Sequence, residues 1–198
     1  MEFREILARR RMHRAFESTP IPREQIERIV GVIRRAPSGG FTQGSSIVVV
    51  TDAATRRQFA DAWADHPLTQ TFVAQAPVHL VLSASESLYH ARYNQPDKLA
   101  ETGGVEVTWP VPYWFVDAGA LMMLVLLAAI DEGLAGAFIG HPEQKRLFAE
   151  IVGLPDEVVP IGLALIGRPA PDPTADRGTS RLRELRRPTG DIVHWERW

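Results

Sequence analysis

The spacing of apolar positions predicts two helices at the start of the chain. The first covers residues 3–10 and leads into a run of arginines. After the proline-rich turn 19–22, apolar residues recur three and four positions apart, at Ile26, Ile29, Val30 and Ile33. This spacing places them on one helix face. Pro37 ends the second helix, because a proline disfavours the helical conformation of the residue before it.

Two continuous apolar runs predict buried strands on either side of a capped helix. The run Ser46–Val50 is rich in β-branched residues and predicts a strand covered on both faces. Asp52 follows it and is placed to cap a helix over 53–64. Val78–Leu82 predicts a second buried strand of the same kind.

The apolar run 118–130 carries no charge and predicts a helix over 117–132 that ends at Gly133. It is shorter than the ~20 residues that cross a bilayer, so we interpret it as a buried helix and expect no membrane contact. A helix that is apolar all round must be covered on every side. In a domain of this size, we expect a subunit interface to provide that cover.

Further apolar segments complete an α+β (α/β layered) domain over residues 1–198, with four or five strands. Strands are predicted over 135–140 and 159–167, with a helix over 142–152 between them. The segment at about 83–115 differs, because it is rich in aromatics and prolines and has weak periodicity. A stretch of this length predicts a lid or binding insertion. The remainder, at about 168–198, is a C-terminal extension rich in proline and arginine.

Composition restricts the function classes. The 198 residues include 22 basic and 24 acidic side chains, for a formal net charge of −2. Nucleic-acid binders usually carry a basic excess, so we expect no nucleic-acid partner. Cysteine is absent, which removes thiolate chemistry and disulfides. The first residues are mixed in charge and show no secretory signal, so we expect a cytoplasmic protein.

Positive charge is nevertheless concentrated in two places, with a glycine-containing turn between them. Arginines crowd the segment 9–14 and, far along the chain, the segment 181–187; the turn is Ala36-Pro37-Ser38-Gly39-Gly40-Phe41-Thr42-Gln43. Clustered guanidinium groups suit an anion, because each donates two parallel hydrogen bonds. Glycines let backbone N–H groups approach a ligand closely. Together they predict a phosphorylated cofactor.

The order of these motifs resembles the nitroreductase-like flavoprotein family. Members open with an Arg-Arg-Ser-x-Arg-x-Phe segment, matched here by Arg10 to Phe16, and continue with an Ala-Pro-Ser-x-x-Asn-x-Gln-Pro-Trp segment, matched by Ala36 to Gln43. Other matching segments are Asp117-Ala118-Gly119-Ala120, Gly133-Leu134-x-Gly136, Ile161 to Pro169 and Val193-His194-Trp195. The resemblance covers nearly the whole chain, and the segment 83–114 matches least.

The resemblance implies a mostly antiparallel sheet flanked by helices, in an intertwined homodimer that holds FMN with both subunits lining each site. Carried over residue by residue, the cofactor contacts from the arginine segments are Arg10, Arg11, Met12, Arg14, Arg183 and Arg186. Those along the flavin of the partner subunit are Pro37, Ser38, Gly39, Phe41 and Gln43. Those whose backbone faces the isoalloxazine are Ala137, Phe138 and Gly140.

Three departures from the family pattern bear on the substrate. Met12 replaces the usual serine, so a contact there is limited to the backbone. Phe41 replaces the usual asparagine, and Gly44-Ser45 replaces the Pro-Trp pair. The resulting Pro-Ser-x-Gly-Phe-x-Gln string is similar to the branch that fragments its own FMN, the 5,6-dimethylbenzimidazole synthases.

Candidate substrate contacts come from the aromatic insertion together with the turn. They are Phe41, His90, Tyr93, Trp109, Tyr113 and Trp114. Aromatics here could form an apolar wall on which a flat acceptor stacks; a core-filling turn is the alternative for Trp109–Trp114. No histidine and carboxylate spacing matches a metal site, so no metal is expected. No residue stands out as a catalytic acid or base.

The sequence therefore favours an FMN-dependent oxidoreductase. NAD(P)H would reduce flavin N5, and a small aromatic, quinone or nitro acceptor would reoxidise it in a ping-pong cycle. Two alternatives remain open: oxygen-dependent fragmentation of FMN, and a flavin-binding protein without turnover, should the insertion close over the flavin.

Overall fold

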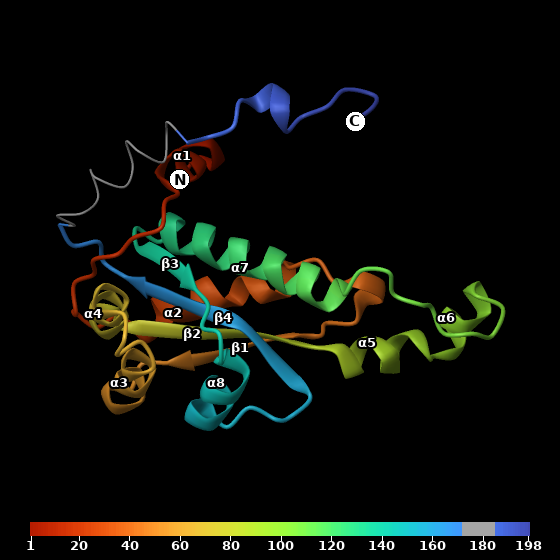
Figure 1. Cartoon of the computed structure of the whole chain (residues 1–198), viewed down its shortest axis with the longest axis horizontal. Coiled ribbons are helices and arrows are strands. Elements are labelled where there is room, and N and C mark those ends of the chain that lie inside the picture. The colour runs from red at the N-terminus through yellow and green to blue at the C-terminus, as the bar shows by residue number, and fades with distance from the viewer. Residues whose placement is uncertain (172–184) are drawn as a thin grey trace.

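The fold is known from a computed structural model that describes residues 1–171 and 185–198. It has three layers, with one sheet between two sets of helices (Figure 1). The predicted Arg183 lies outside the described residues. The chain otherwise follows the α+β class expected from its sequence.

The sheet has four strands, all antiparallel, in the order β1-β2-β4-β3. Their bounds are β1 (Ser45–Val50), β2 (Val78–Ser85), β3 (Ala135–Ile139) and β4 (Val158–Gly167). Every residue of the central strand β2 is buried. The antiparallel sheet of four to five strands is thereby confirmed. The prediction that the strand over residues 46–50 is covered on both faces is wrong for the single chain. Strand β1 is at the edge of the sheet, and Val49 is 42% exposed.

One face of the sheet is covered by α3 (Ala53–Asp61), α4 (Pro67–Gln75) and α8 (Gln144–Val152). Phe59, Phe72 and Phe148 from these helices pack in one cluster with side chains of β2, β3 and β4. As predicted, Asp52 caps α3 by accepting a hydrogen bond from the backbone N–H of Thr55. Helix α4 was not predicted from the sequence.

The opposite face is covered by α2 (Arg23–Val30), a 3₁₀ turn (Gly31–Arg35) and α7 (Tyr113–Asp131). Apolar side chains of these helices pack against alternate residues of β2 and β4, in a second cluster that includes Ile29, Leu80, Leu82, Leu121 and Val125. The short helix α1 (Phe3–Arg9) contacts α7 on its far side (Figure 1).

Helix α7 is longer than the sequence predicted, because it begins four residues earlier, at Tyr113. The helix has 19 residues and is long and apolar enough to cross a membrane, by length and composition alone. An 18-residue window within it has a mean hydropathy of 2.0, and 39% of that window is buried. The inner face packs on the sheet. On the outer face Val116 is 49% exposed, and Ala120, Met123 and Leu127 are partly exposed. The described part of this chain therefore leaves one apolar face of α7 incompletely covered.

The aromatic insertion is more regular than its weak periodicity indicated. Strand β2 continues to Ser85, and helices α5 (Glu86–Tyr93) and α6 (Pro96–Glu101) follow before α7. These two helices extend from one end of the sheet (Figure 1). The last described element is a 3₁₀ turn (Thr189–Asp191) in the C-terminal segment, which lies beyond α1.

Candidate cofactor and substrate site

The N-terminal arginine segment lies against the start of β3. After α1 ends, the backbone N–H of His13 donates to the carbonyl of Gly136 at 3.1 Å. Phe16 then forms a β-bridge with Pro169, beyond β4, and its side chain is 3% exposed. Burial of this one aromatic ring, about 2–3 kcal/mol of apolar transfer, fixes the path of an otherwise polar segment.

The side chains of this segment are available to a ligand. Arg11, Met12 and Arg14 are exposed and Arg10 is half-buried. Arg11 donates from Nε to Nε2 of His13 at 3.2 Å. Within the described part of the chain, no carboxylate forms an ion pair with Arg10, Arg11 or Arg14. Three guanidinium groups thus lie close together along the chain, and no carboxylate of residues 1–171 or 185–198 forms an ion pair with them.

Strand β3 brings a second set of predicted residues to the same edge. Ala137 is buried, Phe138 is half-buried, and Gly140, just beyond the strand, is exposed. The backbone hydrogen bond between His13 and Gly136 therefore joins the predicted phosphate contacts to the predicted flavin-ring contacts. These two sets, far apart in the sequence, meet within one chain.

The loop with Pro37, Ser38 and Gly39 has an unusual backbone. Gly40, Phe41 and Gln43 all adopt left-handed conformations, with φ angles of 58°, 57° and 58°. Such angles are uncommon for residues other than glycine and cost energy there. A Cβ atom on Gly40 would lie 2.8 Å from the Tyr93 ring. Phe41 is 76% exposed, so its strained backbone presents an aromatic side chain to the outside.

Side chains from α5 and α7 hold this loop in place. The backbone N–H of Gly39 donates to Oδ2 of Asp117 at 2.7 Å, and the hydroxyl of Tyr89 donates to the same oxygen. Arg92 donates from Nε to the carbonyl of Gly40 at 2.8 Å. Burial, reinforced by the hydrogen bond to Asp117, raises the pKa of Tyr89. Within the loop, Ser38 Oγ accepts from the backbone N–H of Gln43 at 2.6 Å.

Asp117, Tyr89 and Arg92 were not predicted as site residues. Asp117 is 7% exposed in a helix whose central residues are otherwise apolar. A single carboxylate in such a run was the available signal, because a buried charged group requires hydrogen-bond partners. Nothing in the local sequence around Tyr89 or Arg92 indicated which loop they contact.

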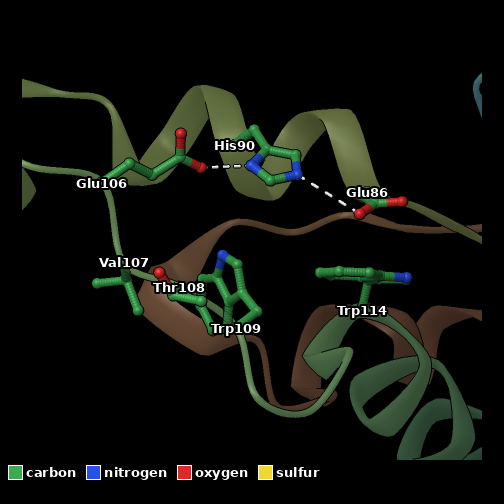
Figure 2. Close-up of a pocket in the computed structure, with 7 residues that line it drawn as sticks. All are labelled: Glu86, His90, Glu106, Val107, Thr108, Trp109 and Trp114. Carbon is green, nitrogen blue, oxygen red and sulfur yellow. Dashed lines mark hydrogen bonds and ion pairs between the residues drawn. The ribbon is translucent and has the colours of Figure 1, made fainter.

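The predicted substrate aromatics gather beside this loop. Trp109 packs edge-on against Tyr93, with ring centroids 4.5 Å apart, and lies 6.0 Å from Tyr89 and 5.6 Å from Tyr113. Trp114 is buried and Tyr113 is 43% exposed. An open cavity of about 370 Å³ lies between Trp109 and Trp114 on one side and His90 with two glutamates on the other (Figure 2).

The two halves of the predicted cofactor site are far apart in one chain. The loop is tied to Asp117 near the start of α7, whereas the arginine segment is tied to Gly136, just after α7 ends at Asp131. At 1.5 Å per residue, these ends of the helix are separated by about 20 Å. Figure 1 shows α1 near one end of α7 and α5 beyond the other. Arg186 is exposed in the C-terminal segment, and neither half of the site has a described contact with it.

Residues 7–168 match the family model of the nitroreductase family. The chain belongs to the nitroreductase family. This family member is 28% identical over 165 residues to an FMN reductase [NAD(P)H] of Bacillus subtilis, and 29% identical over 172 residues to an oxygen-insensitive NADPH nitroreductase of Salmonella typhimurium. The aligned regions cover 79% and 85% of this chain but only 61% and 66% of those two proteins.

Among solved structures, a nitroreductase from Exiguobacterium sibiricum in complex with FMN is similar to this nitroreductase-family chain. The TM-score is 0.75 at 22% identity, and the match covers 99% of this chain and 98% of the other. At that identity the likeness shows the fold. The fold expected from the sequence resemblance is confirmed.

Proposed function

We propose that this chain is an FMN-dependent oxidoreductase of the nitroreductase family, acting with NAD(P)H and a small aromatic, quinone or nitro acceptor. The observation that carries the proposal is the hydrogen bond from the backbone N–H of His13 to the carbonyl of Gly136, since it joins the arginine segment to the backbone edge of β3. The names of the Bacillus and Salmonella relatives support the same class.

The residues on this edge fit an esterified phosphate. Arg10, Arg11 and Arg14 supply charge-assisted donors, and no ion pair with a carboxylate of the described residues competes for them. Arg186 and Arg183 are further candidates from the C-terminal extension. The half-buried Phe138 and the exposed Gly140 leave part of the strand end accessible to a flat ring. This donor set suits FMN, although a deazaflavin with the same phosphate would satisfy it equally.

The loop 37–43 supplies the second half of the site in our proposal. Its conformation is held by Asp117, Tyr89 and Arg92 before any ligand binds, so little entropy is lost when a ring docks against it. Because it lies about 20 Å from the arginine segment along α7, the loop that meets a given cofactor comes from a second subunit. The partly exposed outer face of α7 supports a homodimer, since a second subunit would cover its apolar side chains.

When bound, FMN would supply the hydride chemistry, taking a hydride from a reduced nicotinamide and giving it to the acceptor. The chain itself binds FMN and orients it. The arginine segment neutralises the phosphate, the backbone of β3 and the loop hold the ring, and the Trp109–Tyr113 aromatics exclude water from one side. This division of roles needs no strong acid or base from the protein.

The visible spectrum of the purified protein, with mass spectrometry of whatever heat releases, tests this function. We expect one FMN per chain and rapid NAD(P)H oxidation when a quinone is added. Arg10→Ala should bind FMN about tenfold to a hundredfold more weakly, because it removes a charge-assisted hydrogen bond to phosphate. A colourless protein that takes up no flavin would contradict the proposal. A benzimidazole product formed in air, or bound FMN that cannot be cycled, would favour one of the two alternatives.

A further inference from the structure

A cavity of about 370 Å³ lies beside α5, and its two indoles pack against Tyr89 and Tyr93, which contact the loop 37–43. Its lining residues are Glu86, His90, Glu106, Val107, Thr108, Trp109 and Trp114. Tyr89, Arg92 and Tyr93 of the same helix contact the loop instead. The cavity and the loop thus use different residues of the same helix.

One wall of the cavity is a row of two carboxylates with an imidazole between them (Figure 2). Nδ1 of His90 is hydrogen-bonded to Glu106, and Nε2 lies 3.5 Å from Glu86. Glu106 also accepts from Asn94 at 2.6 Å. The hydrogen bond to Glu106 raises the pKa of His90 and lowers that of Glu106. Even with His90 protonated, two carboxylates leave this wall with net negative charge.

The nearest arginine on α5 does not neutralise that wall. Arg92 donates to the carbonyl of Gly40 and pairs with Asp97 at 2.7 Å, on the other side of the helix. Among the described residues that line the cavity there is neither a lysine nor an arginine. A positively charged ligand would therefore face a wall that keeps a net negative charge even with His90 protonated.

The facing wall is aromatic. Trp109 and Trp114 lie with ring centroids 6.5 Å apart at an interplanar angle of 76°, and His90 is 6.3 Å from Trp114. Tyr93 packs against Trp109 and limits its movement. Indole rings attract cations more strongly than any other aromatic side chain, and a flat ring can stack on them.

We propose that this cavity binds a small aromatic amine or ammonium ion, with its positive nitrogen at Glu86 and Glu106 and its ring against the two indoles. The volume is at the lower end of the range for small-molecule sites, which limits the ligand to one or two rings. The same wall disfavours anionic aromatics. Such a ligand is either an acceptor that is reduced at the flavin or a regulatory ligand that acts through α5 on the loop.

Calorimetric titration of the full-length protein, as purified, tests the charge preference directly. The probes are 2-phenylethylammonium, neutral 2-phenylethanol and anionic 3-phenylpropionate. We expect the ammonium to bind at least fivefold more tightly than the alcohol, and the carboxylate more weakly still. Added salt should reduce the difference, because the carboxylates are partly exposed. Equal binding of the three probes, or no binding, would overturn the proposal.

The doubly substituted variant Glu86→Gln, Glu106→Gln should lose the preference for ammonium over alcohol. Glu86→Gln alone should reduce the preference for ammonium in part. Because Glu86 is exposed, this variant provides the test if the double variant does not fold. Glu101→Gln is the matched control, because Glu101 is exposed on α6, pairs with Lys98 and does not line the cavity. An unchanged preference in the double variant would overturn the assignment.

Turnover measurements distinguish the two possible roles of the ligand, acceptor and regulator. If 2-phenylethylammonium competes with the electron acceptor, the cavity is the acceptor site; a change in rate without competition identifies a regulatory ligand. Both results sustain the cavity as a cation site. The titration does not require flavin chemistry, so a failure of the proposed function remains distinguishable from a failure of this inference.

Discussion

At the scale of single residues, Asp117 connects the core to the candidate site. One of its carboxylate oxygens accepts hydrogen bonds from Gly39 and Tyr89, so a loop and two helices depend on the same atom. A buried acceptor with two donors holds its neighbours firmly, because losing it leaves both donors unpaired.

Asp117→Asn should destabilise the protein by about 1–3 kcal/mol, because a neutral amide oxygen would replace the carboxylate oxygen that accepts hydrogen bonds from both Gly39 and Tyr89. It should also weaken FMN binding, through the loosened loop. Urea unfolding and flavin titration measure the two effects. Asp131→Asn is the control, since Asp131 lies at the other end of α7, its side chain is 49% exposed, and it pairs with the N-terminal amine. Equal losses in both variants would contradict the role given to Asp117.

His79 makes stability depend on pH. It is fully buried, and burial lowers its pKa to about 4 from 6.5. Below pH 6.5 the unfolded chain binds a proton that the folded chain does not. Stability is therefore full above pH 6.5 and declines toward pH 4, by on the order of 3 kcal/mol. His79→Leu should lose most of that decline in urea titrations at pH 7.5, 6 and 5.

His90 serves as the comparison for this pH effect, because its pKa is raised by Glu106. A raised pKa contributes stability that is present below pH 6.5 and lost at higher pH, which is the opposite sign. His90→Gln should therefore keep the acid decline. The same decline in His79→Leu and in the unsubstituted protein would show that other groups cause it.

At the scale of elements, the loop 37–43 combines strained backbone with close packing. Gly40 has a φ of 58°, and its α-carbon faces the Tyr93 ring closely enough that a Cβ would lie 2.8 Å from it. Glycine is required there for two reasons, the left-handed backbone and the space.

Gly40→Ala should therefore destabilise the protein by more than the left-handed backbone conformation alone explains. Gly103→Ala is the matched control, with a φ of 71° and no atom within 4 Å of the added Cβ. We expect Gly103→Ala to lower the free energy of unfolding by about 1 kcal/mol and Gly40→Ala to lower it clearly more. Only Gly40→Ala should bind FMN more weakly. Thermal unfolding and flavin titration provide the measurements. Similar results for both variants would mean that Tyr93 does not confine the loop.

Elements dominated by one strong pattern could be predicted from the sequence. The apolar runs at 46–50 and 78–82 form strands, and the charge-free run inside α7 forms a helix. A continuous β-branched run does not distinguish an edge strand from a central one, so the exposure of β1 was missed. Helices α5 and α6 were missed because aromatics and prolines obscured a short helical period.

At the scale of the whole molecule, the sequence predicted two groups of cofactor contacts, the arginine segment and the loop 37–43. It could not predict the distance between them. The contact of His13 with Gly136 joins segments more than a hundred positions apart, and no local pattern predicts it. The same holds for the separation of the arginine segment from the loop, which depends on the length and direction of α7. Because of that separation, each proposed flavin site requires two subunits.

Hybrid dimers test this requirement most directly. One subunit carries Arg10→Ala with Arg14→Ala, the other carries Gly40→Val, and two different affinity tags isolate the mixed dimer. If each site takes its arginines from one subunit and its loop from the other, one site of the hybrid is intact. We predict one FMN per hybrid dimer, two per unsubstituted dimer and little in either parent variant. Hybrids that bind no more FMN than their parents would contradict the shared site.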